Sequence, residues 1–227
     1  MNRLLSLSVT AAAAMLASAA PAEPPPGSRI DPAPGSVPRQ DVGAQGAALR
    51  IMHRYSACVA RSHQRWAEAM IALPFMSEEQ ANAVRRQQGG EEDCMGYSGL
   101  ELSFRAPLLV GGMAEYLIES RYRAAPLAPV SQLADSDVEA GALAPRNGYE
   151  DLALCVVRRN PTAVRTLLRT PPASAAEQAA ARGLAPDLGP CVPQGQTIAF
   201  GPPTLRGLLA VSFYKTLAAV TSLPGRN

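Results

Sequence analysis

Residues 155–191 read CVVRRNPTAVRTLLRTPPASAAEQAAARGLAPDLGPC, and 97 positions earlier residues 58–94 read CVARSHQRWAEAMIALPFMSEEQANAVRRQQGGEEDC. Both stretches begin and end with cysteine, and eight of their 37 positions are identical without any gap. An internal repeat of this length indicates a chain built from two copies of one structural unit.

The four cysteines predict two disulfides. Four cysteines allow three pairings, and a duplicated unit favours the pairing in which each copy keeps its own bridge, Cys58–Cys94 and Cys155–Cys191. Each bridge would close a loop of 37 residues, and the loss of chain entropy in the unfolded state is then worth about 3.8 kcal/mol. Disulfides of this kind are typical of an oxidising compartment.

The N-terminus predicts export. Asn2-Arg3 supplies a short positive region, Leu4 to Leu16 are largely apolar, and small residues follow at Ala17 to Ala22. These are the three parts of a signal peptide, here residues 1–22, and they place the mature protein in the periplasm or outside the cell. An uncleaved N-terminal anchor is the alternative. Residues 23–47 are rich in Pro, Gly, Ala and Ser, which predicts a disordered tether.

Helical patterns repeat in both copies, which we place at residues 48–123 and 148–227 with a linker at 124–147. Apolar residues recur at helical spacing around Cys58 and Cys155. Ser77-x-x-Gln80 and Ser174-x-x-Glu177 are capping boxes, which predict helices running to about Gln88 and Leu184. Asn160-Pro161 predicts a helix break in the second copy, and His63-Gln64 a softer one in the first. One short helix is expected in the linker, around Gln132–Leu143.

The last part of each copy predicts a short extended segment and then a long helix. The extended segments are Leu100–Phe104 and Thr197–Phe200, which we expect to pair as an antiparallel ladder. Pro107 and Pro203 open the helices, in which the two copies are offset by 96 residues. The fold class is therefore mainly α, with two pseudo-symmetric, disulfide-stapled helical repeats joined by a short two-stranded antiparallel sheet.

The chain resembles a family of uncharacterised exported proteins from alphaproteobacteria. The features that carry the resemblance are Cys155–Pro161, the capped Ala-rich helix Ser174–Arg182, and Cys191 followed by Gln196–Phe200. The resemblance is strongest over residues 149–214. It implies an exported location and a duplicated architecture, and it implies no activity.

Composition argues against several classes of function. The formal net charge is only +2, with 20 arginines and one lysine, so the strong basic field of a nucleic-acid-binding protein is missing. The sequence contains no serine-hydrolase, zinc-protease or phosphate-loop motif. His53 and His63 have no counterparts in the second copy, and Glu91-Glu92-Asp93 is typical of a solvated turn. We therefore expect no metal, no cofactor and no membrane span in the mature chain.

Three arginines form the candidate binding site. Arg158, Arg165 and Arg169 share one face of the broken helix and suit an anionic partner, although a solvated basic face is the simpler interpretation. We expect a non-catalytic periplasmic protein that binds or organises a cell-envelope component or a protein partner. The alternative is a cell-envelope hydrolase that uses Glu101 or Glu115 in the groove between the repeats.

Overall fold

The computed structural model describes residues 42–87, 94, 105–139, 141, 143–192 and 200–222, which all belong to the compact unit Gln40–Asn227. Of these residues 78% are helical. None of them lies in a strand. The mainly α-helical fold class predicted from the sequence is therefore confirmed.

The helices occur in the same order in both repeats. The first repeat contains α1 (Val42–Ser62), α2 (Gln64–Ala72), α3 (Glu78–Gln87) and α5 (Ala106–Arg121). The second repeat contains α8 (Gly148–Arg159), α9 (Pro161–Leu168), α10 (Ala175–Gly183), α11 (Ala185–Leu188), the 3-10 helix η1 (Gly189–Cys191) and α12 (Pro202–Ser222). Between the repeats lie α6 (Ala128–Ser131) and α7 (Asp135–Glu139). Helices α1, α2, α3 and α5 thus correspond to α8, α9, α10 and α12.

Both predicted disulfides are present. Cys58 is bonded to Cys94 and Cys155 to Cys191, and the two Cα atoms are 5.6 Å apart in each bridge. Each bridge ties the first helix of its repeat to the chain that leads into the last helix. The two loops of equal length that the duplication predicts are therefore closed by equivalent disulfides.

The first two helices of each repeat are separated by the same backbone break. His63 has φ −129° and ψ 55°, and the equivalent Asn160 has φ −144° and ψ 66°. The Asn160 side chain caps α9 by accepting a hydrogen bond from the Ala163 N–H, whereas His63 makes no such cap. The softer break expected in the first copy is therefore wrong. The backbone of the first copy makes the same turn as that of the second copy, although the His63 side chain does not cap the helix that follows.

Both serines of the predicted capping boxes cap their helices, while the side chains of Gln80 and Glu177 accept from the N–H groups of Met76 and Ala173, one residue before each serine. The hydroxyl oxygen of Ser77 accepts from the Gln80 N–H at 3.0 Å, and that of Ser174 accepts from the Glu177 N–H at 3.1 Å. These contacts satisfy amide donors that the first turn of a helix leaves without an intrahelical partner. Helices α3 and α10 then run to Gln87 and Gly183, each ending one residue before the sequence-based expectation.

A rare backbone conformation is also duplicated. Met76 has φ 62° and Ala173 has φ 56°, and the two residues are equivalent. Their N–H groups donate to the side chains of Gln80 and Glu177, respectively. Because residues other than glycine seldom adopt positive φ, its occurrence at two equivalent positions shows that the copies follow the same path into α3 and α10.

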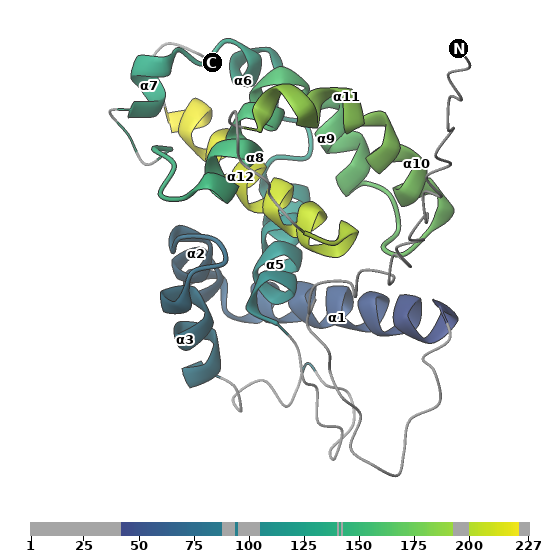
Figure 1. Cartoon of the computed structure of the whole chain (residues 1–227). Coiled ribbons are helices and arrows are strands. Elements are labelled where there is room, and N and C mark those ends of the chain that lie inside the picture. Colours follow the sequence, from purple (N-terminus) through teal and green to yellow (C-terminus); the bar gives the residue numbers. More distant parts are fainter. Residues whose placement is uncertain are drawn as a thin grey trace, which may run out of the picture. The chain divides into compact units, whose positions relative to one another are not determined.

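Helices α5 and α12 cross at the centre of the described helices (Figure 1). Gly111 of α5 lies directly against Gly207 of α12, since a Cβ atom added to Gly111 would be 2.4 Å from the Gly207 Cα. Helix α5 also packs on α1 and α2, while α12 packs on the corresponding α8 and α9. Contact between equivalent residues is what a twofold relation produces, so a local pseudo-twofold axis passes near this crossing.

Three expectations need correction or lie outside the described residues. Helix α1 begins at Val42, inside the range 23–47 expected to be a tether, because no proline interrupts the chain between Pro38 and Pro74. The single helix expected around Gln132–Leu143 is replaced by the shorter α6 and α7. The ladder between Leu100–Phe104 and Thr197–Phe200 falls outside the described residues except for Phe200, which is not in a strand.

The two central helices are buried on nearly all sides. Their apolar faces contact the other helices of the same unit. Among the described residues, no helix combines the length and the apolar character needed to cross a membrane.

Candidate functional site

A groove of about 640 Å³ lies beside the central crossing. Its walls come from α1, α5, α9 and α12, together with the turn that follows α9. Apolar side chains such as Leu168 and Phe213 line part of it, and the polar lining is mainly basic. We call this cavity the open groove. Its basic and histidine side chains are His53, Arg123, Arg165, Arg169 and Arg206.

At the base of the open groove Arg206 and Glu115 form a buried ion pair. The guanidinium donates from Nε to Oε1 at 2.8 Å and from Nη2 to Oε2 at 2.6 Å. The two side chains are 6% and 8% exposed. This two-bonded geometry is the strongest form of a salt bridge. It joins α5 to α12, and therefore joins the two repeats.

Arg206 also closes the end of α9. Its Nη1 donates to Glu177 Oε1 at 3.0 Å, and its Nη2 donates to the carbonyl oxygens of Leu168 and Thr170. A positive side chain at a helix C-terminus satisfies carbonyls that have no intrahelical donor. One arginine thus links α5, the end of α9 and the start of α10.

The carboxylate of Glu115 has a second partner in His53. The His53 Nε2 and the Glu115 Oε2 are 2.9 Å apart. Burial alone would raise the pKa of Glu115, but the hydrogen bonds with His53 and Arg206 outweigh burial and hold that pKa below its ordinary value. The pKa of Arg206 is raised: burial opposes the rise, and the bonds to Glu115 outweigh it. Both groups are therefore charged, and Glu115 is placed as a structural anion rather than a proton donor.

Two of the three predicted arginines line the open groove. Arg165 donates to the carbonyl oxygen of Ala125 at 2.8 Å, and its guanidinium lies 5.7 Å from the centre of the Phe213 ring. Arg169 donates to the carbonyl oxygen of Arg123 at 2.9 Å. Both side chains thus use one donor on the chain that follows α5 and still border the cavity.

The third predicted arginine lies elsewhere. Arg158 donates to Asp135 at 2.8 Å and to the carbonyl oxygen of Leu133 at 2.7 Å, and it does not line the open groove. It holds the segment between the repeats against α8. The structure therefore brings together Arg165 and Arg169 but separates Arg158 from them.

Arg165 is held in an unfavourable environment for a cation. Burial, and after it the charge of Arg169, lower the pKa of Arg165 from its ordinary value, although Glu119 acts in the opposite direction. The Nε of Arg165 is buried and has no hydrogen-bond partner in the described part of the chain. An anion in the groove would relieve the repulsion between the two guanidinium groups.

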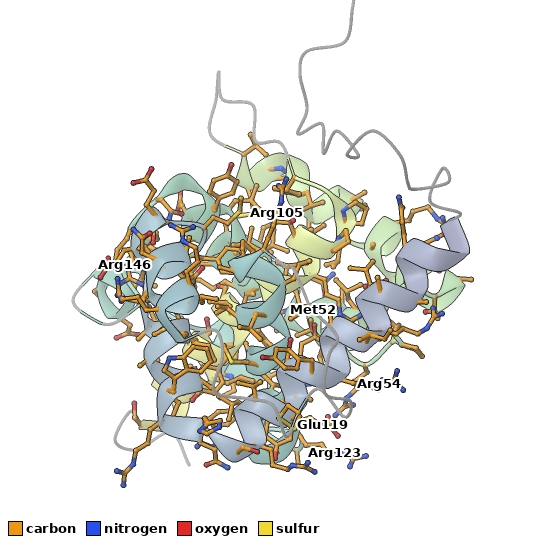
Figure 2. The ribbon with its side chains drawn as sticks, turned by 90° about the horizontal axis from the view of Figure 1, so that it is seen from below. Met52, Arg54, Arg105, Glu119, Arg123 and Arg146 are labelled. Carbon is orange, nitrogen blue, oxygen red and sulfur yellow. A yellow bond between two sulfur atoms is a disulfide. The ribbon has the colours of Figure 1, made fainter. Side chains whose placement is uncertain are left out.

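The rim of the groove carries an exposed ion pair. Arg123 Nε lies 3.0 Å from Glu119 Oε1, one helical turn earlier. Figure 2 shows these two side chains next to each other, well apart from Arg146. They are 74% and 51% exposed, so the pair contributes little stability and is free to rearrange around a bound group.

Sequence reasoning missed Arg206 and the role of His53. Arg206 occupies a position where the equivalent residue is Val110, and Glu115 occupies a position where it is Val211. When a residue is charged and its equivalent in the other copy is apolar, the charged residue is expected to form an ion pair in the folded protein. The other candidate carboxylate, Glu101, lies outside the described residues.

The remaining groups of the described residues add no metal centre. No set of three or more His, Cys, Asp or Glu side chains there is arranged to hold a metal ion. No protein-family model matches the chain, and no curated protein and no solved structure matches it either.

Proposed function

We propose that the protein is a non-catalytic binding protein of the cell envelope, and that its open groove binds an anionic group, a carboxylate or a phosphate, carried by an envelope component or a protein partner. The observation that carries the proposal is the pair Arg165 and Arg169. Both arginine side chains line one cavity, and each donates to a single backbone carbonyl. Arginine presents a fixed set of donors that matches carboxylate and phosphate oxygens.

The charge of Glu115 supports binding over the hydrolase alternative. A hydrolase built on carboxylates needs one acid with a raised pKa beside one that stays ionised. In this groove the pKa of Glu115 is lowered by His53 and Arg206. Its contacts lock the two repeats together and do not point to proton transfer.

Export is part of the same proposal. The chain carries the pattern of a signal peptide at residues 1–22, and its four cysteines form two disulfides. Both features suit the periplasm or the cell exterior, and the resemblance to exported alphaproteobacterial proteins agrees with them. The mass of the protein recovered from a periplasmic fraction tests this part, because cleavage is expected after Ala19 or after Ala22. Recovery of the uncleaved chain in the membrane fraction would contradict it.

A thermal-shift experiment tests anion binding. Inorganic phosphate and N-acetylglutamate are the probes, each compared with sodium chloride at equal ionic strength. A ligand that binds only the folded state raises the midpoint of unfolding as its concentration rises. We expect both probes to raise the midpoint of the oxidised chain, and Arg165→Gln with Arg169→Gln to abolish the rise.

The control is a second pair of arginines outside the groove. Arg86 and Arg182 are exposed, so Arg86→Gln with Arg182→Gln removes the same charge while leaving the groove intact. The rise should persist in this control. The proposal fails if the probes have no effect beyond ionic strength, or if the groove variant responds as strongly as the control.

A further inference from the structure

The pseudo-twofold relation creates a second groove equivalent to the open groove. It lies between α2 and α12, where the open groove lies between α9 and α5. Residues that line one groove occupy the positions of residues that line the other. The equivalent pairs are Ile118 and Tyr214, Glu119 and Lys215, Arg165 and Glu68, and Leu168 and Ile71.

The inner half of this second groove is filled by the chain itself. In the open groove the inner wall includes His53, Ala57 and Glu115. At the equivalent wall Leu143 and Ala144 of the segment between the repeats are packed, so that only about 20 Å³ remains at the inner end, while the outer part of the groove keeps a cavity of about 670 Å³. Leu143 is 8% exposed. The shape of such a groove therefore suits a non-helical peptide segment.

A charged side chain anchors this segment. Arg146 donates from Nη2 to the carbonyl oxygen of Ala72 at 2.6 Å, and its backbone N–H donates to Glu150 at 2.9 Å. Glu150 also accepts from Lys215 at 2.8 Å. The occupant thus supplies a cation, and the groove supplies the opposing carboxylate.

The lining of the open groove differs in charge. Glu150, the partner of Arg146, corresponds to His53, while Glu68 and Ala72, which line the second groove, correspond to Arg165 and Arg169. Glu119 stands where the second groove has Lys215. Since the polar lining of the open groove is mainly basic, an occupant that binds in the same way is expected to carry a carboxylate near the position at which the segment between the repeats carries Arg146. Like charges placed opposite each other oppose binding, and opposite charges set the orientation.

We propose that the open groove binds a non-helical, acidic peptide segment of a partner protein, in the way that residues 143–146 occupy the inner end of the equivalent groove. Small apolar side chains fill its inner half, and a carboxylate of the peptide pairs with Arg165 and Arg169. This inference rests on the proposed function and specifies the class of its ligand. The groove volume of about 640 Å³ exceeds that of a single phosphate or carboxylate group and is typical of sites for larger ligands.

The chain provides its own probe. The peptide Gly-Ala-Leu-Ala-Pro-Glu-Asn is the sequence of residues 141–147 with glutamate in place of Arg146, and Gly-Ala-Leu-Ala-Pro-Arg-Asn is the matched basic peptide. Each is labelled with a fluorophore and titrated with the oxidised full chain, to ~1 mM protein because a free segment lacks the effective concentration of a tethered one. Fluorescence anisotropy reports binding. We expect the acidic peptide to bind at least about fivefold more tightly than the basic one.

A charge-exchange variant tests the location. Arg165→Glu with Arg169→Ala gives the open groove the residues that the equivalent groove has in Glu68 and Ala72. The variant should prefer the basic peptide, reversing the order. Arg182→Glu with Arg86→Ala makes the same charge change at exposed positions and should keep the preference for the acidic peptide.

The outcomes separate this inference from the proposed function. If phosphate and N-acetylglutamate bind in an Arg165- and Arg169-dependent way but the acidic peptide binds no better than N-acetylglutamate, the peptide inference is overturned and the proposed function stands. If neither the small anions nor the peptide binds, both are overturned. Peptide binding that the charge-exchange variant leaves unchanged would place the site elsewhere, and would also overturn the inference.

Discussion

Gly111 and Gly207 face each other where α5 and α12 cross, and each is the equivalent of the other in the two repeats. A Cβ atom on Gly111 would lie 2.4 Å from the Gly207 Cα, and one on Gly207 would lie 2.9 Å from the Pro107 carbonyl oxygen. Both distances are far below a normal contact. The duplication thus keeps glycine at a place where the copies approach each other backbone to backbone.

Replacing either glycine should destabilise the protein. We expect Gly111→Ala and Gly207→Ala each to lower the free energy of unfolding by about 1–3 kcal/mol, because the added methyl group pushes α5 and α12 apart. Helix propensity alone predicts the opposite sign, since alanine is favoured over glycine by about 1 kcal/mol in a helix. Urea denaturation of the oxidised chain measures the change.

The control is Gly183→Ala. Gly183 lies at the end of α10, where an added Cβ meets nothing within 4 Å. This variant should be neutral or slightly more stable. An equal loss of stability in Gly111→Ala and Gly183→Ala would contradict the close packing at the crossing.

The ion pair of Glu115 and Arg206 breaks the symmetry beside this crossing. Its equivalents in the other half are Val211 and Val110, which are both buried. One side of the pseudo-twofold axis is thus ionic and borders the open groove, while the other side is apolar. The asymmetry gives the open groove a charged base built on α5 and α12, whereas the charges at the inner end of the second groove are those of Glu150 and Lys215.

A double-mutant cycle should reveal this pair. Glu115→Val leaves the Arg206 guanidinium buried without its main partner, and we expect a loss of about 3–5 kcal/mol in the free energy of unfolding. Glu115→Val with Arg206→Val copies the apolar side of the axis and should lose less than the sum of the two single variants by ~2 kcal/mol or more. Strictly additive losses would show that the two side chains do not act as a pair.

Local signals explain what the sequence predicted well. Each capping box spans four residues, Asn160 caps the helix that begins at the next residue, and the cysteines are marked by the repeat itself. These features depend on neighbours along the chain, so spacing is enough to find them. The disulfide pairing needed only the additional assumption that each copy closes its own loop.

Long-range features could not be found in this way. Glu115 and Arg206 are separated by 91 residues, and no local spacing relates them. Leu133 and Leu143 belong to a proline-containing segment without a single helical period, and they are buried because the groove that receives them exists only after the repeats have packed. The single face predicted for Arg158, Arg165 and Arg169 does not form, for the same reason. Arg158 lies apart from the other two because its hydrogen-bond partners belong to that segment.

The disulfides should contribute similar amounts of stability. Both bridges join residues 36 positions apart, so each restricts the unfolded chain equally, by an amount worth about 3.8 kcal/mol. We expect Cys58→Ala with Cys94→Ala, and Cys155→Ala with Cys191→Ala, each to lower the free energy of unfolding by about 2–4 kcal/mol. Urea denaturation measures both. A loss confined to one pair would mean that the other bridge does not constrain the unfolded state.

Acid should weaken the protein through Glu150. Burial would raise the pKa of this carboxyl, but hydrogen bonds from Lys215 and from the Arg146 backbone and side chain lower it from 4.5 to about 2. A carboxyl whose pKa is lower in the folded state stabilises that state above its unfolded pKa, and the stabilisation is lost as the pH falls from about 4.5 towards 2. The pKa of Glu115 is shifted in the same direction and should add to the loss.

Comparison with Glu150→Gln isolates this contribution. The variant removes the titrating group but keeps the size of the side chain, so the difference in the thermal midpoint from the original chain should be largest near neutral pH and should shrink as the pH falls below about 4.5. Glu79 is exposed on α3, and Glu79→Gln should follow the original chain closely over the whole range. Midpoints recorded from pH ~7 to ~2 decide the matter. If the Glu150→Gln curve ran parallel to that of the original chain across this window, the ion pair of Glu150 with Lys215 would not be the acid-sensitive contact that holds the segment between the repeats in its groove.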